Sequence, residues 1–286
     1  MSRTTAFLRY VRRNPTLAIG LIIVIVIGLF CLIGVRLIDV RTQPYPLAAP
    51  PNKPPSAQYW FGTDAQGRNL FAAIVVGTVL TLRIGLTAGA IGLGAGTVLA
   101  FVAAYYRGWL DTAIRAVVDV LLTIPGLLVL VVIASVNRRA MNVESMALIV
   151  ASLAWLAPAR NIRAQVLSLR ERPFVLVARL SGMNGLEIIF RELMPNLLPY
   201  LAASFVGSVT GAIFASIGLE ALGLGPLREP TLGMTIYWVL YYSALLKGMW
   251  WWFVAPIFVI VLIFVSLFLL GTGLDELANP RVRRMA

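Results

Sequence analysis

The sequence contains no histidine and only one cysteine among its 286 residues. Histidine is the commonest general base near neutral pH and a frequent metal ligand, so its absence argues against hydrolytic and metal-dependent chemistry. Cys31 lies in an apolar run and has no second cysteine for an intrachain disulfide. The G-x-x-x-x-G-K-[ST] phosphate loop is also missing. We therefore predict no catalytic residues, no metal site and no enzymatic activity in this chain.

Charged residues are scarce as well, at 13% of the chain, whereas hydrophobic residues make up 59% and the mean hydropathy is +0.87. This apolar share exceeds that of soluble domains. Several runs are long enough to cross a hydrocarbon core of about 30 Å, and runs of that length favour helices over a barrel. The sequence predicts an all-α integral membrane protein.

We expect six spans, at residues 17–35, 79–105, 113–136, 146–159, 197–219 and 252–270. The first run follows several arginines and resembles a signal peptide, but its apolar part is too long for a signal-peptide core, which favours an uncleaved anchor. The fourth run is the shortest. Glycines at 92, 94 and 96 lie inside the second span and are expected to permit close helix packing, not to cradle phosphate.

The formal charge of +12 fits either nucleic-acid binding or orientation in a membrane by positive cytoplasmic loops. The positions favour orientation, with both termini in the cytoplasm and no nucleic-acid partner. Arg138 and Arg139, in an outer loop, are exceptions. Fifteen of the 24 basic residues fall in the expected cytoplasmic segments: Arg3, Arg9, Arg12, Arg13, Arg107, Arg115, Arg160, Arg163, Arg170, Arg172, Arg179, Arg191, Arg281, Arg283 and Arg284.

The outer segment 36–68 contains "PYPLAAPPNKPP", whose prolines prevent a regular helix and indicate an extended strap. "WFGTDAQGRNLF" follows. Its Gly62 and Gly67 permit turn conformations, and Asp64 can accept hydrogen bonds from the backbone or from Arg68. We interpret this stretch as a turn that launches the second span, with room for a short interfacial helix after it, and keep a binding site as the alternative.

The stretch "FVLVARLSGMNGLEIIFRELMPNLLPYL" begins at Phe174 and interrupts the apolar pattern. Apolar residues recur at helical spacing from Phe174, Gly182 and Gly185 supply a turn, and residues 186–193 form a second short helix that Pro195 helps to end. We predict a helix-turn-helix elbow in a cytoplasmic segment of about 35 residues. Such an elbow serves either as an interfacial anchor or as a docking site for a soluble partner.

This elbow resembles the EAA loop of permease subunits from binding-protein-dependent ABC importers. Ala178 matches the second alanine of that loop, Gly182 its glycine and Pro195 its proline, whereas Leu176 stands where the family has glutamate. "RRNPTLAIGL", "FGTDAQGRN", "RGWLDTAIRAVVDVLLTIPGLLV", "ARNIRAQVLSLRERPFV" and "LLGTGLDELANPRVR" are similar to the dipeptide/oligopeptide/nickel branch, with Asn69 replacing an aspartate.

The resemblance implies a five-helix permease core behind an extra N-terminal helix, divided here into residues 1–78, 79–274 and 275–286. It implies a homologous second permease, two cytoplasmic ATPases that hold ATP and Mg, an extracytoplasmic solute-binding protein, and a bacterial or archaeal plasma membrane. No cofactor is expected in this chain. The residues expected to couple to the ATPase are Phe174, Leu176, Ala178, Arg179, Gly182, Glu187, Arg191 and Pro195. A secondary transporter is the alternative, but buried ionisable groups and repeated halves are not evident.

Candidate path residues come from two places. Asp119 lies inside the third span, where it either serves gating or pairs with Arg115, and Pro125 is expected to kink that span. Tyr237, Trp238, Tyr241 and Tyr242 follow helical spacing between the fifth and sixth spans, whereas Trp250–Trp252 indicate an interfacial belt. Peptides are the substrate of the branch; the aromatic rings keep oligosaccharides as the alternative, and the absence of histidine argues against nickel.

Overall fold

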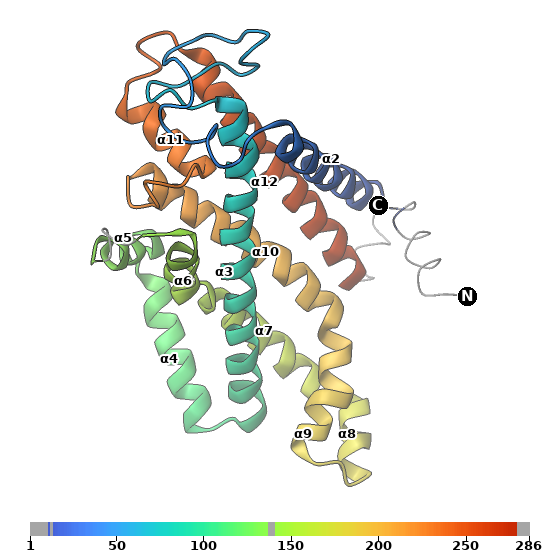
Figure 1. Cartoon of the computed structure of the whole chain (residues 1–286). Coiled ribbons are helices and arrows are strands. Elements are labelled where there is room, and N and C mark those ends of the chain that lie inside the picture. The colour runs from blue at the N-terminus through green and yellow to red at the C-terminus, as the bar shows by residue number, and fades with distance from the viewer. Residues whose placement is uncertain (1–10, 12–13, 137–140, 279–286) are drawn as a thin grey trace.

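The structure is a computed structural model that describes residue 11, residues 14–136 and residues 141–278. The described residues form a bundle of helices without β-strands (Figure 1). The outer segment 38–69 lies at one end, here called the outer-loop end, and the elbow lies at the opposite end, the elbow end. The predicted all-α membrane fold is therefore confirmed.

Four helical runs are long and apolar enough to span a membrane. They are α2 (Pro15–Leu37), α3 (Leu70–Tyr106), the continuous run Gly185–Ala221 and Trp250–Glu276 of α12 (Trp250–Ala278). Two bent pairs bring the number to six if each pair is one span. The second span begins nine residues before its predicted start, because α3 follows directly from the "GTDAQGRN" turn without a separate interfacial helix.

Helix α3 forms the centre of the bundle, and small residues allow its neighbours to approach closely. A Cβ atom on Gly92 would lie 2.6 Å from Ala154 Cβ, and one on Gly96 would lie 2.7 Å from Pro158 Cβ. No side chain larger than hydrogen fits there without displacing the backbone of the neighbouring helix. The predicted packing role is confirmed for Gly92 and Gly96, but it is wrong for Gly94, where a Cβ would meet nothing within 4 Å.

The third span is not the single kinked helix that the sequence predicts. Helix α4 (Trp109–Thr123) and α5 (Gly126–Val136) meet at 88°, so α5 runs across the bundle (Figure 1). Ile124, immediately before Pro125, is extended with ψ 132°, which is the conformation that proline imposes on the preceding residue. Pro125 therefore ends one helix and does not merely bend it.

The fourth span also differs from its prediction. Helix α6 (Val143–Ala154) and α7 (Leu156–Arg170) meet at 41° around Trp155, and α7 continues eleven residues beyond the predicted end of the span at residue 159. Arg160, Arg163 and Arg170 are therefore helical residues with partners on neighbouring elements, not parts of an irregular loop.

The fifth span starts inside the elbow. Helix α9 (Gly185–Glu187), the π-helical turn η2 (Ile188–Leu193) and α10 (Met194–Ala221) form one continuous run. The prediction that Pro195 helps to end the second elbow helix is wrong. Pro195 is the second residue of α10 and directly follows the π-helical turn η2, and the helical run continues past it. The elbow is thus joined to the fifth span without a loop.

Candidate coupling site

The elbow folds because its turn carries an end signal and a start signal in succession. Helix α8 (Pro173–Leu180) ends in a Schellman motif: Met183 N–H donates to Ala178 O at 3.2 Å, and Gly182 N–H donates to Arg179 O at 3.0 Å. Gly182 has φ +80°, which a residue with a Cβ adopts at a cost. A capping box between Asn184 and Glu187 then starts α9.

The two helices of the elbow bury one face and expose the other. Val175, Ala178, Ile188 and Leu193 pack with Phe101 and its neighbours on α3 and with residues of α7. Phe174 is partly buried at the edge of the same cluster. The opposite face is apolar but exposed, and we call it the elbow face: Leu176, Val177, Leu180, Leu186 and Phe190. Leu176 is 58% exposed and Phe190 is 64% exposed.

The charged residues of the predicted coupling set lie around this face. Arg179 and Arg191 are exposed. Glu187 accepts the Asn184 N–H at 3.0 Å and lies 3.9 Å from Arg191, so its shorter contact is the one that caps α9. Pro195 is also exposed, at the second residue of α10. The elbow therefore presents an apolar surface with a largely basic rim.

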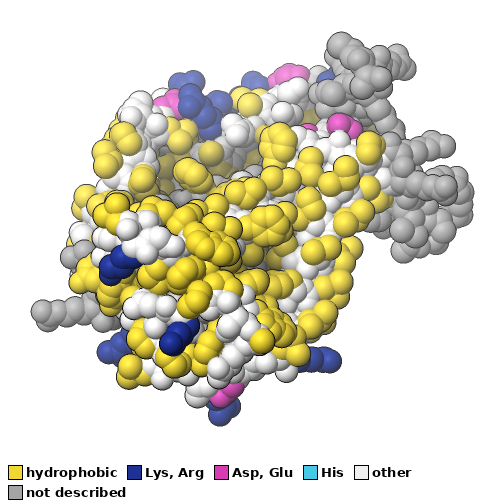
Figure 2. All heavy atoms as spheres, turned by 90° about the horizontal axis from the view of Figure 1, so that it is seen from above, with side chains coloured by type: hydrophobic (Ala, Val, Ile, Leu, Met, Phe, Trp, Pro, Cys, Tyr) yellow, Lys and Arg dark blue, Asp and Glu magenta, His cyan; other side chains and the backbone are white. Residues whose placement is uncertain are grey.

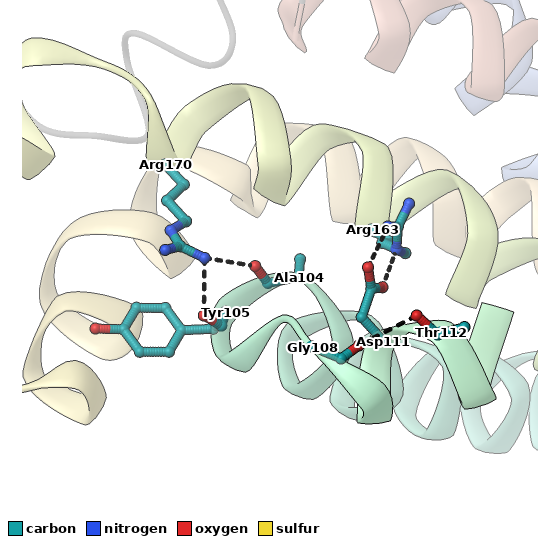
Figure 3. Close-up of polar contacts among 7 residues, drawn as sticks. All are labelled: Ala104, Tyr105, Gly108, Asp111, Thr112, Arg163 and Arg170. Atoms are coloured by element: carbon teal, nitrogen blue, oxygen red, sulfur yellow. Dashed lines mark hydrogen bonds and ion pairs between the residues drawn. The ribbon is translucent and has the colours of Figure 1, made fainter.

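Arg170 joins α7 to the end of α3 beside the elbow (Figure 3). Its guanidinium donates to Ala104 O at 3.0 Å and to Tyr105 O at 2.8 Å, which are carbonyls of the last turn of α3. A cation is favoured at a helix C-terminus, where these carbonyls lack intrahelical partners. The same guanidinium lies 5.6 Å from the centre of the Tyr105 ring.

Two ion pairs hold the turn between α3 and α4 against α7. Arg163 binds Asp111 with two parallel bonds, Nε to Oδ1 at 2.5 Å and Nη2 to Oδ2 at 2.6 Å (Figure 3). This geometry restricts both side chains and is stronger than a single contact. Arg107 and Glu171 form a second pair at 2.7 Å, but both are more than half exposed. The inner pair therefore contributes more to fixing α4.

The sequence offered Arg115 as a partner for Asp119, but the structure does not form that pair. Asp119 faces α7 and lies 3.4 Å from Arg160, so it makes a second link between α4 and α7 beside the Asp111–Arg163 pair. Arg115 is only one helical turn from Asp119 in the chain, but α7 places Arg160, from a distant part of the chain, within ion-pair distance of the carboxylate. Asp119 remains a candidate for gating because the pair is half exposed.

A cavity of about 650 Å³ lies between the bent third span, the bent fourth span and α10. The bend at Pro125 contributes Ile124 and Gly126 to its wall, and α10 contributes a row of small residues. Those small residues are Ser204, Gly207, Ser208, Gly211, Ala215 and Gly218. Their spacing of three or four places them along one side of the helix. The sequence contained this row, but without the bends nothing indicated a cavity beside it.

At the outer-loop end, the predicted path aromatics lie on helix α11 (Leu232–Tyr241). Their helical spacing is therefore confirmed. Tyr237 packs against Gly223, and Trp238 lies beneath Arg68, whose guanidinium carbon is 5.5 Å from the ring centre. Tyr241 is exposed, and Tyr242 follows the helix and contacts Gln66 through its hydroxyl. Figure 2 shows this end, where hydrophobic side chains predominate and charged ones are sparse.

Trp252 is not part of an interfacial belt. It is fully buried and packs with Leu70, Val239 and the Tyr242 ring. Trp250 is exposed, as a belt residue would be, and Trp251 Nε1 donates to Thr63 O at 3.4 Å. The three consecutive tryptophans therefore have three different environments, which the rotation of 100° per residue along a helix explains.

The predicted turn role of "GTDAQGRN" is confirmed. Asp64 Oδ1 accepts the N–H groups of Gln66 and Arg68, both at 2.8 Å. Asn52 N–H donates to Asp64 O at 3.0 Å, so the turn also ties down the proline strap. Burial is the main cause that raises the pKa of Asp64 above its ordinary value, and burial lowers the pKa of Arg68.

The sequence reasoning missed Glu220, which lies one residue beyond the predicted fifth span and is completely buried. A signal was present, since Gly223 and Gly225 follow closely and mark the end of a helix. The two glycines do not indicate that the Glu220 side chain is buried. Its partners come from α11 and the preceding loop.

Comparison with known proteins identifies the family. Residues 92–284 match the family described as "Binding-protein-dependent transport system inner membrane component". The chain is 30% identical over 284 residues to the dipeptide transport system permease protein DppC of Bacillus subtilis, covering 99% of this chain and 88% of that protein. It is 29% identical over 233 residues to the oligopeptide transport system permease protein OppC of Mycobacterium tuberculosis, covering 82% and 79%. The chain belongs to this family and is a permease subunit of the multi-pass membrane class.

Proposed function

We propose that the chain is one permease subunit of an ABC importer for di- or oligopeptides, and that its elbow docks a cytoplasmic ATPase. The observation that carries the proposal is the elbow itself: an exposed apolar face on a helix pair that is anchored on α3 and α7 and continues directly into the fifth span. The similar proteins named above are peptide permeases, which favours peptides over the oligosaccharide alternative.

The proposed complex contains a homologous second permease, two ATPases and an extracytoplasmic solute-binding protein. ATP and Mg are held by the ATPases, and this chain holds no cofactor. The elbow end faces the cytoplasm and the outer-loop end faces the binding protein, with both termini cytoplasmic. All of the arginines assigned to the termini, and Arg138 and Arg139, lie outside the described residues.

Coupling follows from the connections of the elbow. When the two ATPases close on nucleotide, each displaces the elbow that it grips, and rigid-body rotation of the helices turns the path outward. Helix α10 transmits the displacement because it is continuous with the second elbow helix. Two ion pairs from α7 to α4, together with the contact of Arg170 with the end of α3, oblige the bent third span to follow. The cavity beside α10 then opens or closes as its walls move.

Leu176 determines the chemistry of the docking contact. The family glutamate would offer a charge at this position, whereas this chain offers an exposed leucine among four other exposed apolar residues. An exposed apolar patch on a charged rim is typical of a protein interface. We infer that the ATPase receives the elbow in an apolar groove with an acidic edge that faces Arg179 and Arg191.

The experiment is reconstitution with the cognate ATPases and binding protein in lipid vesicles. We expect the ATPases to co-purify, and we expect a peptide-loaded binding protein to stimulate ATP hydrolysis and peptide uptake. Uptake driven by a proton gradient without ATPases would replace the proposal by secondary transport. Stimulation by oligosaccharide alone would retain the importer and overturn the peptide assignment.

A further inference from the structure

Glu220 occupies the last turn of α10 and is 0% exposed. None of the ion pairs among the described residues includes it. A buried carboxyl group without a counter-charge is strongly unfavourable unless hydrogen-bond donors replace water. The residues that supply those donors therefore reveal what Glu220 holds in place.

The donors come from the start of α11. The Thr231 hydroxyl donates to Glu220 Oε2 at 2.7 Å, and the backbone amides of Gly233 and Met234 also interact with the carboxyl group. Thr231 Oγ1 in turn accepts the Met234 N–H at 3.1 Å. A carboxyl group at a helix N-terminus is favoured by the free N–H groups and by the helix dipole. Glu220 is thus an N-terminal cap supplied by another helix.

A second contact ties the same helix end to α3. Leu232 N–H donates to the hydroxyl oxygen of Thr81, on α3, at 3.1 Å. Thr231, Leu232 and Thr81 are all buried. The N–H groups of the first turn of α11 therefore donate to side chains of α10, of α3 and of the cap residue Thr231.

Glycines make room for the carboxyl group. A Cβ on Gly233 would overlap Glu220 Oε2, and one on Gly225 would lie 2.6 Å from Glu220 Cγ. Gly223, at φ +76°, ends α10 in a Schellman motif in which its N–H donates to Glu220 O at 2.8 Å. The Tyr237 ring covers Gly223. The side chain and the backbone of Glu220 are both used to seat α11 on the end of α10.

We propose that Glu220 is a positioning residue that fixes α11 to the end of α10, so that both move as one body during transport. The consequence for transport rests on the proposed function; the fixation does not. Helix α11 forms part of the outer-loop end and carries the aromatic residues Tyr237, Trp238 and Tyr241. Through Glu220, a displacement of the elbow would reach these rings by way of one continuous helix and one buried carboxyl group.

The test measures the α10–α11 distance directly. In a Cys31→Ser background, spin labels at Leu222→Cys and Leu240→Cys, both exposed positions, report the distance distribution in lipid nanodiscs. We expect Glu220→Ala to broaden the distribution at least about twofold and to lower binding-protein-stimulated ATP hydrolysis about tenfold, because buried donors on α11 lose their acceptor. Glu220→Gln keeps the shape and an acceptor for Thr231, so it should remain within about twofold of the parent in both measurements.

A second variant and a control keep the result decisive. Thr231→Val removes one donor while leaving Glu220 in place, and we expect intermediate broadening if Glu220→Ala does not assemble. Glu144→Ala removes an exposed carboxylate and should change neither measurement. An unchanged distribution in both Glu220→Ala and Thr231→Val overturns the inference. Absence of any co-purifying ATPase overturns the proposed function instead, while the distance measurement still tests Glu220.

Discussion

Tyr105, in the last turn of α3, lies directly against Gly185, the first residue of α9. A Cβ on Gly185 would come within 2.8 Å of the Tyr105 hydroxyl oxygen. The same ring is covered by the Arg170 guanidinium. One tyrosine therefore contacts the elbow on one side and α7 on the other, at the place where the proposed ATPase force enters the membrane helices.

Gly185→Leu should weaken coupling. The larger side chain must displace Tyr105, and overpacking of this kind costs typically about 1–3 kcal/mol. We expect the complex to insert but binding-protein-stimulated ATP hydrolysis to fall by about an order of magnitude. Gly94→Leu is the matched control, because a Cβ at that position meets nothing within 4 Å. Equal loss in both variants would show that the Tyr105 contact is not the cause.

Gly182→Val should uncouple ATP hydrolysis from uptake for a different reason. Space is open around Gly182, but its φ of +80° is strained for a β-branched residue, at a cost of about 1–2 kcal/mol. The turn should open and tilt the elbow face. Gly28→Val, on α2 in open space and without a positive φ, controls for bulk. Wild-type uptake per ATP in Gly182→Val contradicts the docking role.

Leu176→Ala should weaken ATPase binding. If the leucine is buried in an apolar groove on docking, its truncation costs about 1.5 kcal/mol, or roughly tenfold in affinity. Leu198→Ala, on the exposed side of α10 at 57%, should leave affinity unchanged. Surface-immobilised ATPase and the permease in nanodiscs give the dissociation constant. Tighter binding by Leu176→Glu would show that the groove retains the polar site of the family.

Asp111→Asn should destabilise the elbow end more than Glu171→Gln does. The Asp111–Arg163 pair is bidentate and mostly shielded from solvent, so its loss should cost about 1.5–3 kcal/mol. The exposed Arg107–Glu171 pair should be worth about 0–1 kcal/mol. Thermal unfolding of the two variants in detergent orders these contributions, and a double-mutant cycle isolates each pair. Equal shifts in Tm would refute the ranking.

Ionisation of Asp64 should make the outer turn less stable as the pH rises. Its folded-state pKa is raised by burial, so the folded turn binds the proton more tightly than the unfolded chain. The stabilisation is complete below the unfolded value near 3.8 and declines as the pH rises through the raised value. The hydrogen-exchange rates of the Gln66 and Arg68 amides, divided by the same rates in Asp64→Asn at each pH, measure this dependence. A ratio that does not change with pH contradicts it.

Local signals predicted the elbow and the outer turn well. Gly182 ends one helix, and Asn184 with Glu187 starts the next, so all the determinants lie within six residues of one another. The outer turn is equally local, since Asp64 binds the amides of Gln66 and Arg68. Where the stabilising contacts are near neighbours in the chain, the pattern of residues is enough.

Features that depend on distant contacts were predicted poorly. Pro125 marks where a helix must end, but the angle of 88° is set by what α5 packs against. Asp119 pairs with Arg160 on another helix instead of with its neighbour Arg115. Glu220 is buried by residues of the following loop and helix. In each of these three cases the determining partner is absent from the local sequence.

The uninterrupted helical run from Gly185 to Ala221 has a thermodynamic consequence for the whole assembly. At 1.5 Å per residue, its 37 residues extend about 55 Å, with the proposed ATPase contact at one end and the seat of α11 at the other. If a ligand at the outer-loop end changes the affinity of the ATPase by some factor, the ATPase must change the affinity for that ligand by the same factor. A loaded binding protein and a nucleotide-bound ATPase would therefore be reciprocal effectors, and either could be titrated to measure the other.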